Sequence, residues 1–348
     1  MGICNFGQLV EKYFATGITM NVPLSDFSGK KIAIDISMLY YAYIAKAKDI
    51  VAKEINICNE TPNQDDINKT ALKMLFMKIL TFLKHKIIPV IVFDGTPHPL
   101  KLNCKEEREH KKQTATKSYE LLRSQISLSP DEISEEKLRK AYKQINHIDS
   151  SFKKMCQDMI YAIGIPVIYA DEFPIVSKDA EAVCACLSYN GLVHATFTED
   201  SDYHTYGGRL AITEIVGDVC KVRDLKEMLD SKNMPFHCFQ DLCILMGTDF
   251  NTKIKGKGPV ANWDYIYKYG IIEHYLVGEG LSIDSTASCL KLYPEIRSMF
   301  RCTQLKINIL PLIPNIERFL TIGIIYLTNI KMDGYVETIR NCYQTILS

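Results

Sequence analysis

Two apolar runs decide the fold: residues 31–36 read KIAIDI and residues 87–93 read IIPVIVF. Each run has the length of a strand and is apolar on both faces, which is typical of a buried strand in a parallel sheet. Two further runs of strand length, 165–169 (IPVIY) and 192–197 (LVHATF), are separated from them by longer stretches of helical character. This alternation predicts an α/β protein with a mainly parallel, twisted sheet flanked by helices.

The composition excludes several other classes of protein. The 348 residues are 47% hydrophobic and 24% charged, as in a globular protein rather than a disordered, collagen-like or coiled-coil chain. The 41 basic and 41 acidic residues cancel, so a polyanion would have to be held by a local basic surface. The sequence offers neither an apolar run long enough for a bilayer nor a secretory signal, and the 12 cysteines are mostly scattered singly. We therefore expect an intracellular protein with reduced cysteines.

The patterning along the chain predicts two domains. Residues 1–235 would form the α/β domain, with an N-terminal part (1–100), a charged helical insertion (100–150) and an internal part (151–235). In the insertion, the sequence SLSPDEIS interrupts two helical segments with a proline. From residue 236 onward apolar residues recur at helical spacing, so residues 236–348 are expected to be a helical region.

Acidic side chains follow the predicted strands. Asp35 ends the first strand, Asp94 follows the second, and Asp200 and Asp202 follow the fourth in the run TEDSD. Because the carboxyl ends of parallel strands meet at one edge of a sheet, these carboxylates can converge although they are distant in sequence. A single aspartate after a strand is usually the cap of the next helix, but capping does not explain three acids in five positions. In an extended segment, Asp200 and Asp202 would also project to the same side.

Three further acids are ambiguous on local evidence. Asp179 and Glu181 open a helix, where interaction with the helix dipole explains them as well as a functional role does, and Asp249 lies in a loop. Seven carboxylates near one point would repel each other unless cations neutralise them or their pKa values rise. Oxygen ligands without histidine or cysteine favour a hard cation. We therefore expect two Mg²⁺ ions, with Mn²⁺ as a substitute, which would promote an in-line phosphoryl displacement.

Basic residues follow the second predicted strand. Lys101, Lys105, Arg108 and Lys112 recur at helical spacing and should lie along one helix face. Such a stripe is usually a solvated surface, but its position beside a predicted metal site favours a role for Lys101 and Arg108 in gripping a scissile phosphate.

A second basic segment is a glycine-rich turn, which would let backbone amides approach a phosphate. It contains Lys253, Lys255, Gly256, Lys257 and Gly258. Tyr40 and Tyr41 lie one turn into the helix that follows the first strand, where one ring could stack on a base and the other would pack in the core.

Seven stretches together resemble the structure-specific 5′ nucleases typified by flap endonuclease. They are MGICNF, IAIDISMLYY, VIVFDGTPHPLK, SKDAEAVCACL, ATFTEDSDYHTYG, DLCILMGTDF and IKGKGP, which occur in the order of the family over about residues 1 to 265. The resemblance implies a PIN-like nuclease domain that hydrolyses DNA phosphodiesters with two Mg²⁺ ions near the base of a 5′ flap. It also implies 5′ to 3′ exonuclease activity, a role in DNA replication, repair or recombination, and a location in the nucleus or at another site of DNA replication.

The resemblance also implies roles for individual residues. The metal-site residues would be Asp35, Asp94, Asp179, Glu181, Asp200, Asp202 and Asp249, and the catalytic basic pair would be Lys101 and Arg108. DNA contacts would come from Gly2, Tyr41, Lys105 and Lys112, and from a helix-two-turn-helix near 247–270 that holds duplex DNA and, in relatives, a K⁺ ion. Residues 100–148 would form a helical arch that selects a free 5′ end.

Three positions depart from the family pattern. Asp179 stands where the family usually has glutamate, and Lys257 occupies a usually apolar place in the turn. The last residues, NCYQTILS, lack the peptide that binds the sliding clamp, so clamp binding is not supported.

Two alternatives remain open. One is a related nuclease that prefers another substrate, such as a bubble, a Holliday junction or RNA. The other is a noncatalytic nucleic-acid-binding module that has kept the fold. The complete set of seven acids favours an enzyme, because a retired site should lose carboxylates that repel one another.

Overall fold

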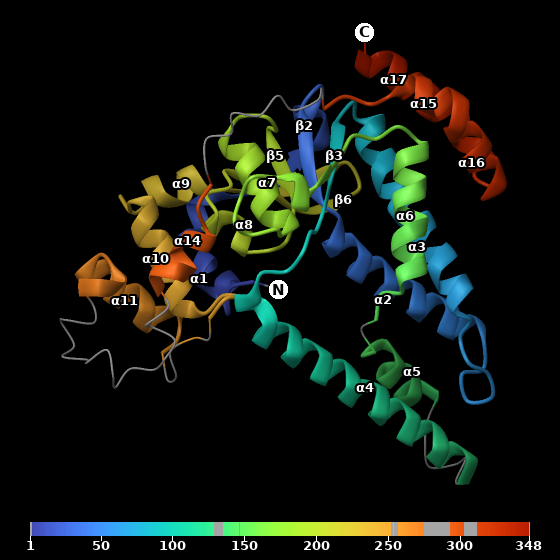
Figure 1. Ribbon diagram of the computed structural model, residues 1–348, viewed down its shortest axis with the longest axis horizontal. Helices are drawn as coiled ribbons and strands as arrows, with labels where there is room; N and C mark the ends of the chain where they lie inside the picture. The colour runs from blue at the N-terminus through green and yellow to red at the C-terminus, as the bar shows by residue number, and fades with distance from the viewer. Residues whose placement is uncertain are drawn as a thin grey trace. The chain divides into compact units, whose positions relative to one another are not determined.

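The computed structural model describes residues 2–128, 135–145, 147–251, 253, 257–274, 293–302 and 312–347. Strands among these residues form one seven-stranded sheet in the order β1-β7-β6-β5-β2-β3-β4. Figure 1 labels four of its neighbouring strands, β6, β5, β2 and β3. The strands are β1 (Ile18–Pro23), β2 (Lys31–Asp35), β3 (Ile88–Phe93), β4 (Val167–Tyr169), β5 (Ala195–Phe197), β6 (Leu210–Val216) and β7 (Val219–Asp224). The prediction of a mixed α/β protein with a mainly parallel sheet is confirmed.

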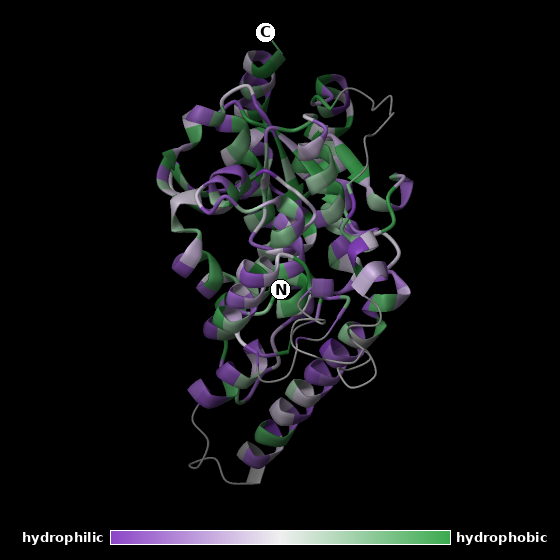
Figure 2. Ribbon diagram, turned by 90° about the vertical axis from the view of Figure 1, so that its left-hand side faces the viewer, coloured by the Kyte–Doolittle hydropathy of each residue, from purple (hydrophilic) through white to green (hydrophobic). Residues whose placement is uncertain are grey.

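The centre of the sheet is parallel and its β1–β7 side is antiparallel. Strands β6, β5, β2, β3 and β4 are paired in parallel, whereas β7 runs antiparallel to both β6 and β1. All residues of β3 and four of the five residues of β2 are buried, as their apolar sequences predict, and hydrophobic residues gather in the strands in Figure 2. Asp35 lies opposite Val92, and Ile34 lies opposite Phe197. The carboxyl ends of β2, β3 and β5 are therefore level at one edge of the sheet.

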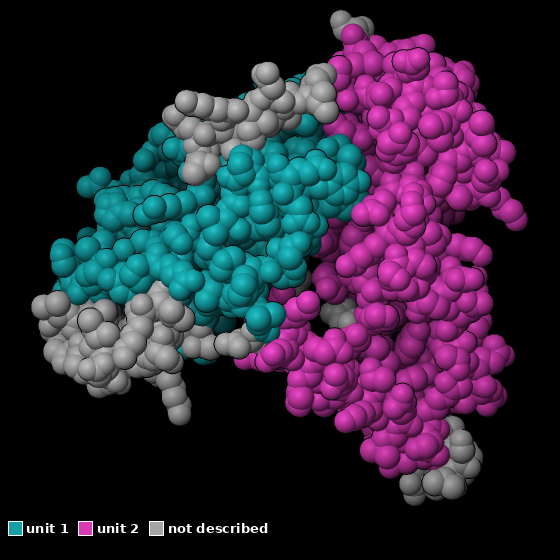
Figure 3. Space-filling view, in the orientation of Figure 1, with its two compact units in different colours: residues 1–35, 85–102, 167–312 teal, residues 36–84, 103–166, 313–348 magenta. Residues whose placement is uncertain are grey.

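The chain divides into two compact units whose segments alternate along the sequence. The first comprises residues 1–35, 85–102 and 167–312, and the second comprises residues 36–84, 103–166 and 313–348 (Figure 3). The expected domain boundary at residue 235 stays a prediction, although a helix does begin at Phe236.

The first unit contains the sheet and the helices that pack against it. Its helices are α1 (Phe6–Tyr13), α7 (Ala180–Tyr189), α8 (Asp202–Thr205), α9 (Leu225–Asp230), α10 (Phe236–Met246), α11 (Pro259–Tyr269) and α14 (Tyr293–Met299). Helix α7 packs directly on β2, β3 and β5, and its nine residues from Ala180 to Ser188 are buried. This packing fixes the first turn of α7 beside the carboxyl edge of the sheet.

The second unit is helical. Its helices are α2 (Ile36–Glu54), α3 (Gln64–Lys84), α4 (Leu102–Leu128, whose first residue belongs to the first unit), α5 (Glu135–Lys143), α6 (Ser150–Ala162), α15 (Ile316–Arg318), α16 (Ile324–Asn329) and α17 (Val336–Leu347). The ring of Tyr40 packs edge-on against Phe152 at 5.5 Å, and Phe76 packs in the same way against Tyr335 at 5.3 Å. Helices α4 and α5 are the helical pair predicted for residues 100–150; residues 129–134 between them lie outside the described residues.

No described helix combines the length and the apolar character that a membrane span requires.

We expect Arg297→Met to destabilise the first unit by about 3 to 5 kcal/mol, because it leaves a buried carboxylate without its partner. The guanidinium of Arg297 bonds to Asp241 Oδ1 at 2.8 Å and to Glu273 Oε1 at 2.9 Å, and Asp241 is only 1% exposed. The measurement is urea unfolding, with Arg301→Met at an exposed position as the control. Equal losses in the two variants would contradict a special role for the ion cluster.

Candidate active site

Three segments of the sheet deliver acids to its carboxyl edge. Asp35 is the last residue of β2 and is 5% exposed, Asp94 directly follows β3, and Asp200 lies in the loop after β5. Burial, together with the charges of Asp35, Glu181 and Asp94, raises the pKa of the buried Cys184 thiol. Acids from β2, β3 and α7 are therefore close enough to act on a single buried group.

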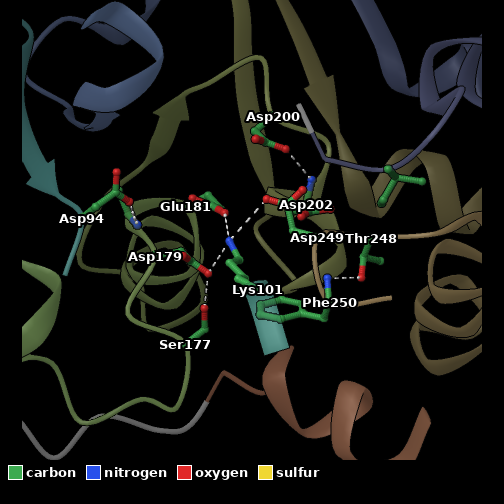
Figure 4. Close-up of polar contacts among 12 residues, drawn as sticks. Asp94, Lys101, Ser177, Asp179, Glu181, Asp200, Asp202, Thr248, Asp249 and Phe250 are labelled. Atoms are coloured by element: carbon green, nitrogen blue, oxygen red, sulfur yellow. Dashed lines mark hydrogen bonds and ion pairs between the residues drawn. The ribbon is translucent and has the colours of Figure 1, made fainter. Parts of the chain in front are cut away.

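The first turn of α7 adds two more acids. Asp94 Oδ1 accepts a hydrogen bond of 2.8 Å from the backbone N–H of Ala180, so an acid from another segment satisfies this helix end (Figure 4). Asp179 stands at the N-cap position but makes no capping bond with its side chain. Because the helix begins at Ala180, both Asp179 and Glu181 can face the edge of the sheet. Capping therefore does not account for Asp179.

The ammonium group of Lys101 lies among three carboxylates. Its Nζ is 2.7 Å from Asp179 Oδ2, 3.5 Å from Glu181 Oε1 and 3.5 Å from Asp249 Oδ2 (Figure 4). It also lies 5.0 Å from the centre of the Phe250 ring. Lys101 ends the 3₁₀ turn Pro99–Lys101, one residue before α4, so it belongs to the first unit together with the acids.

The loop after β5 differs from the extended segment expected from the TEDSD sequence. Asp200 Oδ1 accepts a hydrogen bond from the N–H of Asp202 at 3.1 Å, and Asp202 is the first residue of α8. The short turn replaces the strand geometry because the aspartate side chain competes for backbone donors. Asp202 is 1% exposed, and neither of its carboxylate oxygens has a hydrogen-bond partner among the described residues.

Burial and like charge disfavour the ionised acids in this pocket. Burial raises the pKa of Asp200 and, more strongly, those of Glu181 and Asp202, and neighbouring carboxylates add to the rise. Burial alone would lower the pKa of Lys101, but Glu181, Asp179 and Asp249 outweigh it and raise the pKa above its usual value. Lys101 is therefore charged at any physiological pH, and a further cation would relieve the remaining repulsion.

The acids offer the oxygen ligands that a hard cation prefers, but their side chains are not positioned around a single metal-binding point. Among the residues that the structure describes, no three His, Cys, Asp or Glu side chains form a ready-made metal-ligand set. The ammonium of Lys101 holds Asp179, Glu181 and Asp249 instead. The donors are all oxygens, which Mg²⁺ and Mn²⁺ prefer, and the two oxygens of Asp202 have no hydrogen-bond partner among the residues described.

Several supporting residues were not predicted from the sequence. Ser177 donates a hydrogen bond to Asp179 Oδ2, and the hydroxyl of buried Tyr206 donates to Asp179 at 3.4 Å. Asp171 accepts a bond of 2.7 Å from the N–H of Thr96 and so anchors the turn after Asp94. Tyr206 and Asp171 are far in sequence from their partners, so no local pattern marks them, whereas Ser177 is only two residues from Asp179.

The glycine at position 2 also lies beside the acids. Gly2 has a φ of +87°, and a Cβ on it would come within 2.1 Å of Asp200 Oδ1. Next to it, Ile3 donates its backbone N–H to Ser201 Oγ at 2.7 Å. A larger residue at position 2 would displace Asp200, and the expected contact of Gly2 with DNA stays a prediction.

Four further residues with predicted roles, Arg108 in catalysis and Tyr41, Lys105 and Lys112 in DNA contact, belong to the second unit. Lys105, Arg108 and Lys112 are on α4 in the second unit, and Lys112 pairs with Glu109 at 3.3 Å. Tyr40 packs in the core and Tyr41 is 38% exposed, while the stacking of Tyr41 on a base stays a prediction.

The glycine-rich turn is described only in part. Lys253 is exposed, and Lys257 donates to the hydroxyl of Tyr265. Gly258 is the N-cap of α11. Lys255 and Gly256 lie outside the described residues.

A pH experiment tests the repulsion in the pocket. A carboxyl whose pKa is raised in the folded state stabilises the fold below its ordinary pKa, and this contribution is lost as the pH rises through the raised value. Without divalent metal, Asp202→Asn should therefore melt at a higher temperature than the wild type, with a gap that widens as the pH rises above the ordinary pKa of an aspartate. The measurement is thermal unfolding in EDTA. A gap that does not change with pH would contradict an ionised, repelled Asp202.

Two family models match the segments that carry the acids. The XPG N-terminal domain matches residues 1–115 and the XPG I-region matches residues 164–249, so the seven predicted acids, Lys101 and Arg108 fall within these matches, whereas the turn at 253–258 lies beyond them. Flap endonuclease 1 of Leishmania major is 32% identical over 312 residues, which cover 86% of this chain and 73% of that protein. Flap endonuclease 1 of Salmo salar is 30% identical over 308 residues, which cover 86% and 74%.

The fold is also shared with solved structures. The catalytic core of Rad2 in complex with a DNA substrate superimposes with a TM-score of 0.65 at 18% identity, covering 99% of this chain and 100% of that one. The XPG regions together with the acid-lined pocket define a structure-specific nuclease, a hydrolase that acts on DNA. Within that class, the chain belongs to the flap endonuclease family.

Proposed function

We propose that this nuclease is a Mg²⁺-dependent 5′ flap endonuclease with 5′ to 3′ exonuclease activity, acting in DNA replication, repair or recombination. The observation that carries the proposal is the cluster of acids around Lys101 at the carboxyl edge of the sheet. There, Lys101 contacts the carboxylates of Asp179, Glu181 and Asp249, the first two of them buried, and the two buried oxygens of Asp202 have no hydrogen-bond partner in the part of the chain that the structure describes. Family membership supplies the nuclease chemistry for this pocket.

Seven acids are proposed to hold the metal, directly or through water. They are Asp35, Asp94, Asp179, Glu181, Asp200, Asp202 and Asp249. When bound, a pair of Mg²⁺ or Mn²⁺ ions supplies charge that activates water and stabilises the leaving oxygen of a phosphodiester. Asp94 and Asp200 already accept backbone hydrogen bonds, which fix their carboxylates in place. Ser177 and Tyr206 orient Asp179 in the same way.

Two basic residues are proposed to hold the scissile phosphate. Lys101 carries a permanent positive charge, and its amine is a compact donor that can contact one phosphate oxygen. Arg108 follows two turns later on α4 and offers a planar fork that can bind two oxygens at once. Charge that develops on the phosphate during cleavage would be stabilised by both groups.

The remaining proposed roles concern the DNA around the cleaved bond. Helices α4 and α5 are proposed to form the arch that admits a free 5′ end, with Lys105 and Lys112 contacting the strand. Tyr41, whose ring is partly exposed, is proposed to stack on a base. The turn at 253–258 and the start of α11 are proposed to hold duplex DNA, and a K⁺ ion there is a further proposal.

A substrate panel tests the proposal. Labelled 5′ flap, blunt duplex, bubble, Holliday junction and RNA-containing versions of one sequence are incubated with the wild type, with and without Mg²⁺. We expect cleavage near the flap base to be fastest and to require the metal. Faster cleavage of another junction or of RNA would show that the protein is a nuclease with that substrate preference instead. DNA binding without cleavage of any substrate would contradict the proposed enzymatic activity.

A further inference from the structure

A second charged pocket lies at the opposite edge of the sheet from the carboxylates. It is a cavity of about 510 Å³ where β2 and β6 begin and β7 ends. Its lining includes Lys30, Lys31, His194 and Arg209. These side chains come from separate segments of the first unit, which the sheet brings together at the amino ends of its parallel strands.

The positive charge of this pocket is not balanced. None of Lys30, Lys31 and Arg209 forms an ion pair with an acid in the described ranges. Burial, followed by the charges of Lys30 and Arg209, lowers the pKa of His194, so the two cations are close enough to act on one ring.

Asp224 supplies the acidic side chain of the lining. Its carboxylate caps α9 by accepting the N–H groups of Lys226 at 2.7 Å and Glu227 at 3.2 Å. The positive charges of Lys30, Lys31 and Arg209 therefore share the pocket with this carboxylate, which already accepts hydrogen bonds from the start of a helix. Like charges held together in a concave site cost free energy unless an anion joins them.

We propose that this pocket binds a small anion with two or more phosphate charges, of the size of a nucleoside diphosphate. The volume lies within the range of small-ligand sites, and Leu192, Val193 and Leu210 provide apolar wall beside the cations. A concave pocket suits a compact free phosphate ester better than it suits a continuous DNA backbone, which would require an extended basic surface. The proposal does not depend on the nuclease function.

Calorimetric titration of the full chain with inorganic pyrophosphate in EDTA tests the proposal, because EDTA excludes metal bridging at the carboxylate site. We expect the wild type to bind, and Lys30→Gln and Arg209→Gln each to weaken binding by at least about tenfold, since each removes a charge-assisted contact. Lys232→Gln, at an exposed lysine outside the pocket, is the matched control and should bind as the wild type does.

A variant that gains affinity excludes misfolding as an explanation. Asp224→Asn keeps a residue that caps helices well but removes the carboxylate charge from the pocket lining, so this variant should bind pyrophosphate several-fold more tightly. Absence of binding by the wild type, or equal binding by all variants, would overturn the proposal. Displacement of pyrophosphate by short duplex DNA, with the same dependence on Lys30 and Arg209, would also overturn it, because the pocket would then belong to a DNA-binding face.

Discussion

Asp200→Asn is expected to slow cleavage of a 5′ flap at least about a thousandfold, which corresponds to about 4 kcal/mol of transition-state stabilisation. The substitution removes one proposed metal ligand while its amide oxygen can still accept the bond from the N–H of Asp202. The fold should therefore survive. The measurement is single-turnover cleavage with Mg²⁺, combined with flap binding in Ca²⁺, which should remain measurable.

The control for this prediction is an acid of the same type outside the pocket. Asp230 is exposed and pairs across one turn with Lys226, so Asp230→Asn should cleave the flap as fast as the wild type does. If Asp200→Asn keeps substantial turnover, Asp200 has no role in holding metal. Loss of both cleavage and folding would show instead that Asp200 serves the structure.

Lys101→Met should change three properties at once. Cleavage should slow by at least about a hundredfold, because a contact proposed to stabilise the transition state is lost. The metal-free protein should lose about 3 to 5 kcal/mol of stability, since three acids are left without their cation. Affinity for a divalent ion should rise, because a competing positive charge leaves the pocket.

These effects are separable by experiment. Thermal unfolding in EDTA measures how much stability is lost when the positive charge of Lys101 is removed. Calorimetric titration with Ca²⁺ measures metal affinity without turnover. Lys226→Met, at an exposed lysine, is the control and should alter neither quantity. Unchanged or weaker Ca²⁺ binding by Lys101→Met would mean that Lys101 and the metal do not compete. A loss of DNA affinity equal to the loss of rate would reduce Lys101 to a docking residue.

The two strands that position Asp35 and Asp94 could be predicted because their sequences are compatible with few structures other than a buried strand. β2 and β3 are apolar throughout, and a buried parallel strand is the structure that buries both faces. β1 was not predicted, since most of its residues are exposed and its pairing with β7 contains an irregularity near Asn21, whose φ is 57°. The β6–β7 hairpin was also missed, although Gly217 and Asp218 between the strands are typical turn residues.

The acids of the site were easier to predict than their arrangement. Strand ends locate Asp35 and Asp94, because sheet topology decides where they meet. The contact of Lys101 with Asp179 depends on where α4 and α7 begin, which periodicity fixes only to within a few residues. The turn at Asp200 follows from side-chain competition for backbone donors, which alternation along a strand does not reveal.

The alternation of the two units has a consequence for synthesis on the ribosome. Six segments alternate between the units, and the carboxylates from Asp35 to Asp249 come from all three segments of the first unit. A nascent chain that has released only its amino-terminal half therefore exposes unmatched strands and an incomplete acid cluster. For the same reason, neither unit can be produced as an uninterrupted fragment. Isolating the first unit would require new linkers between its three segments or a circular permutation of the chain.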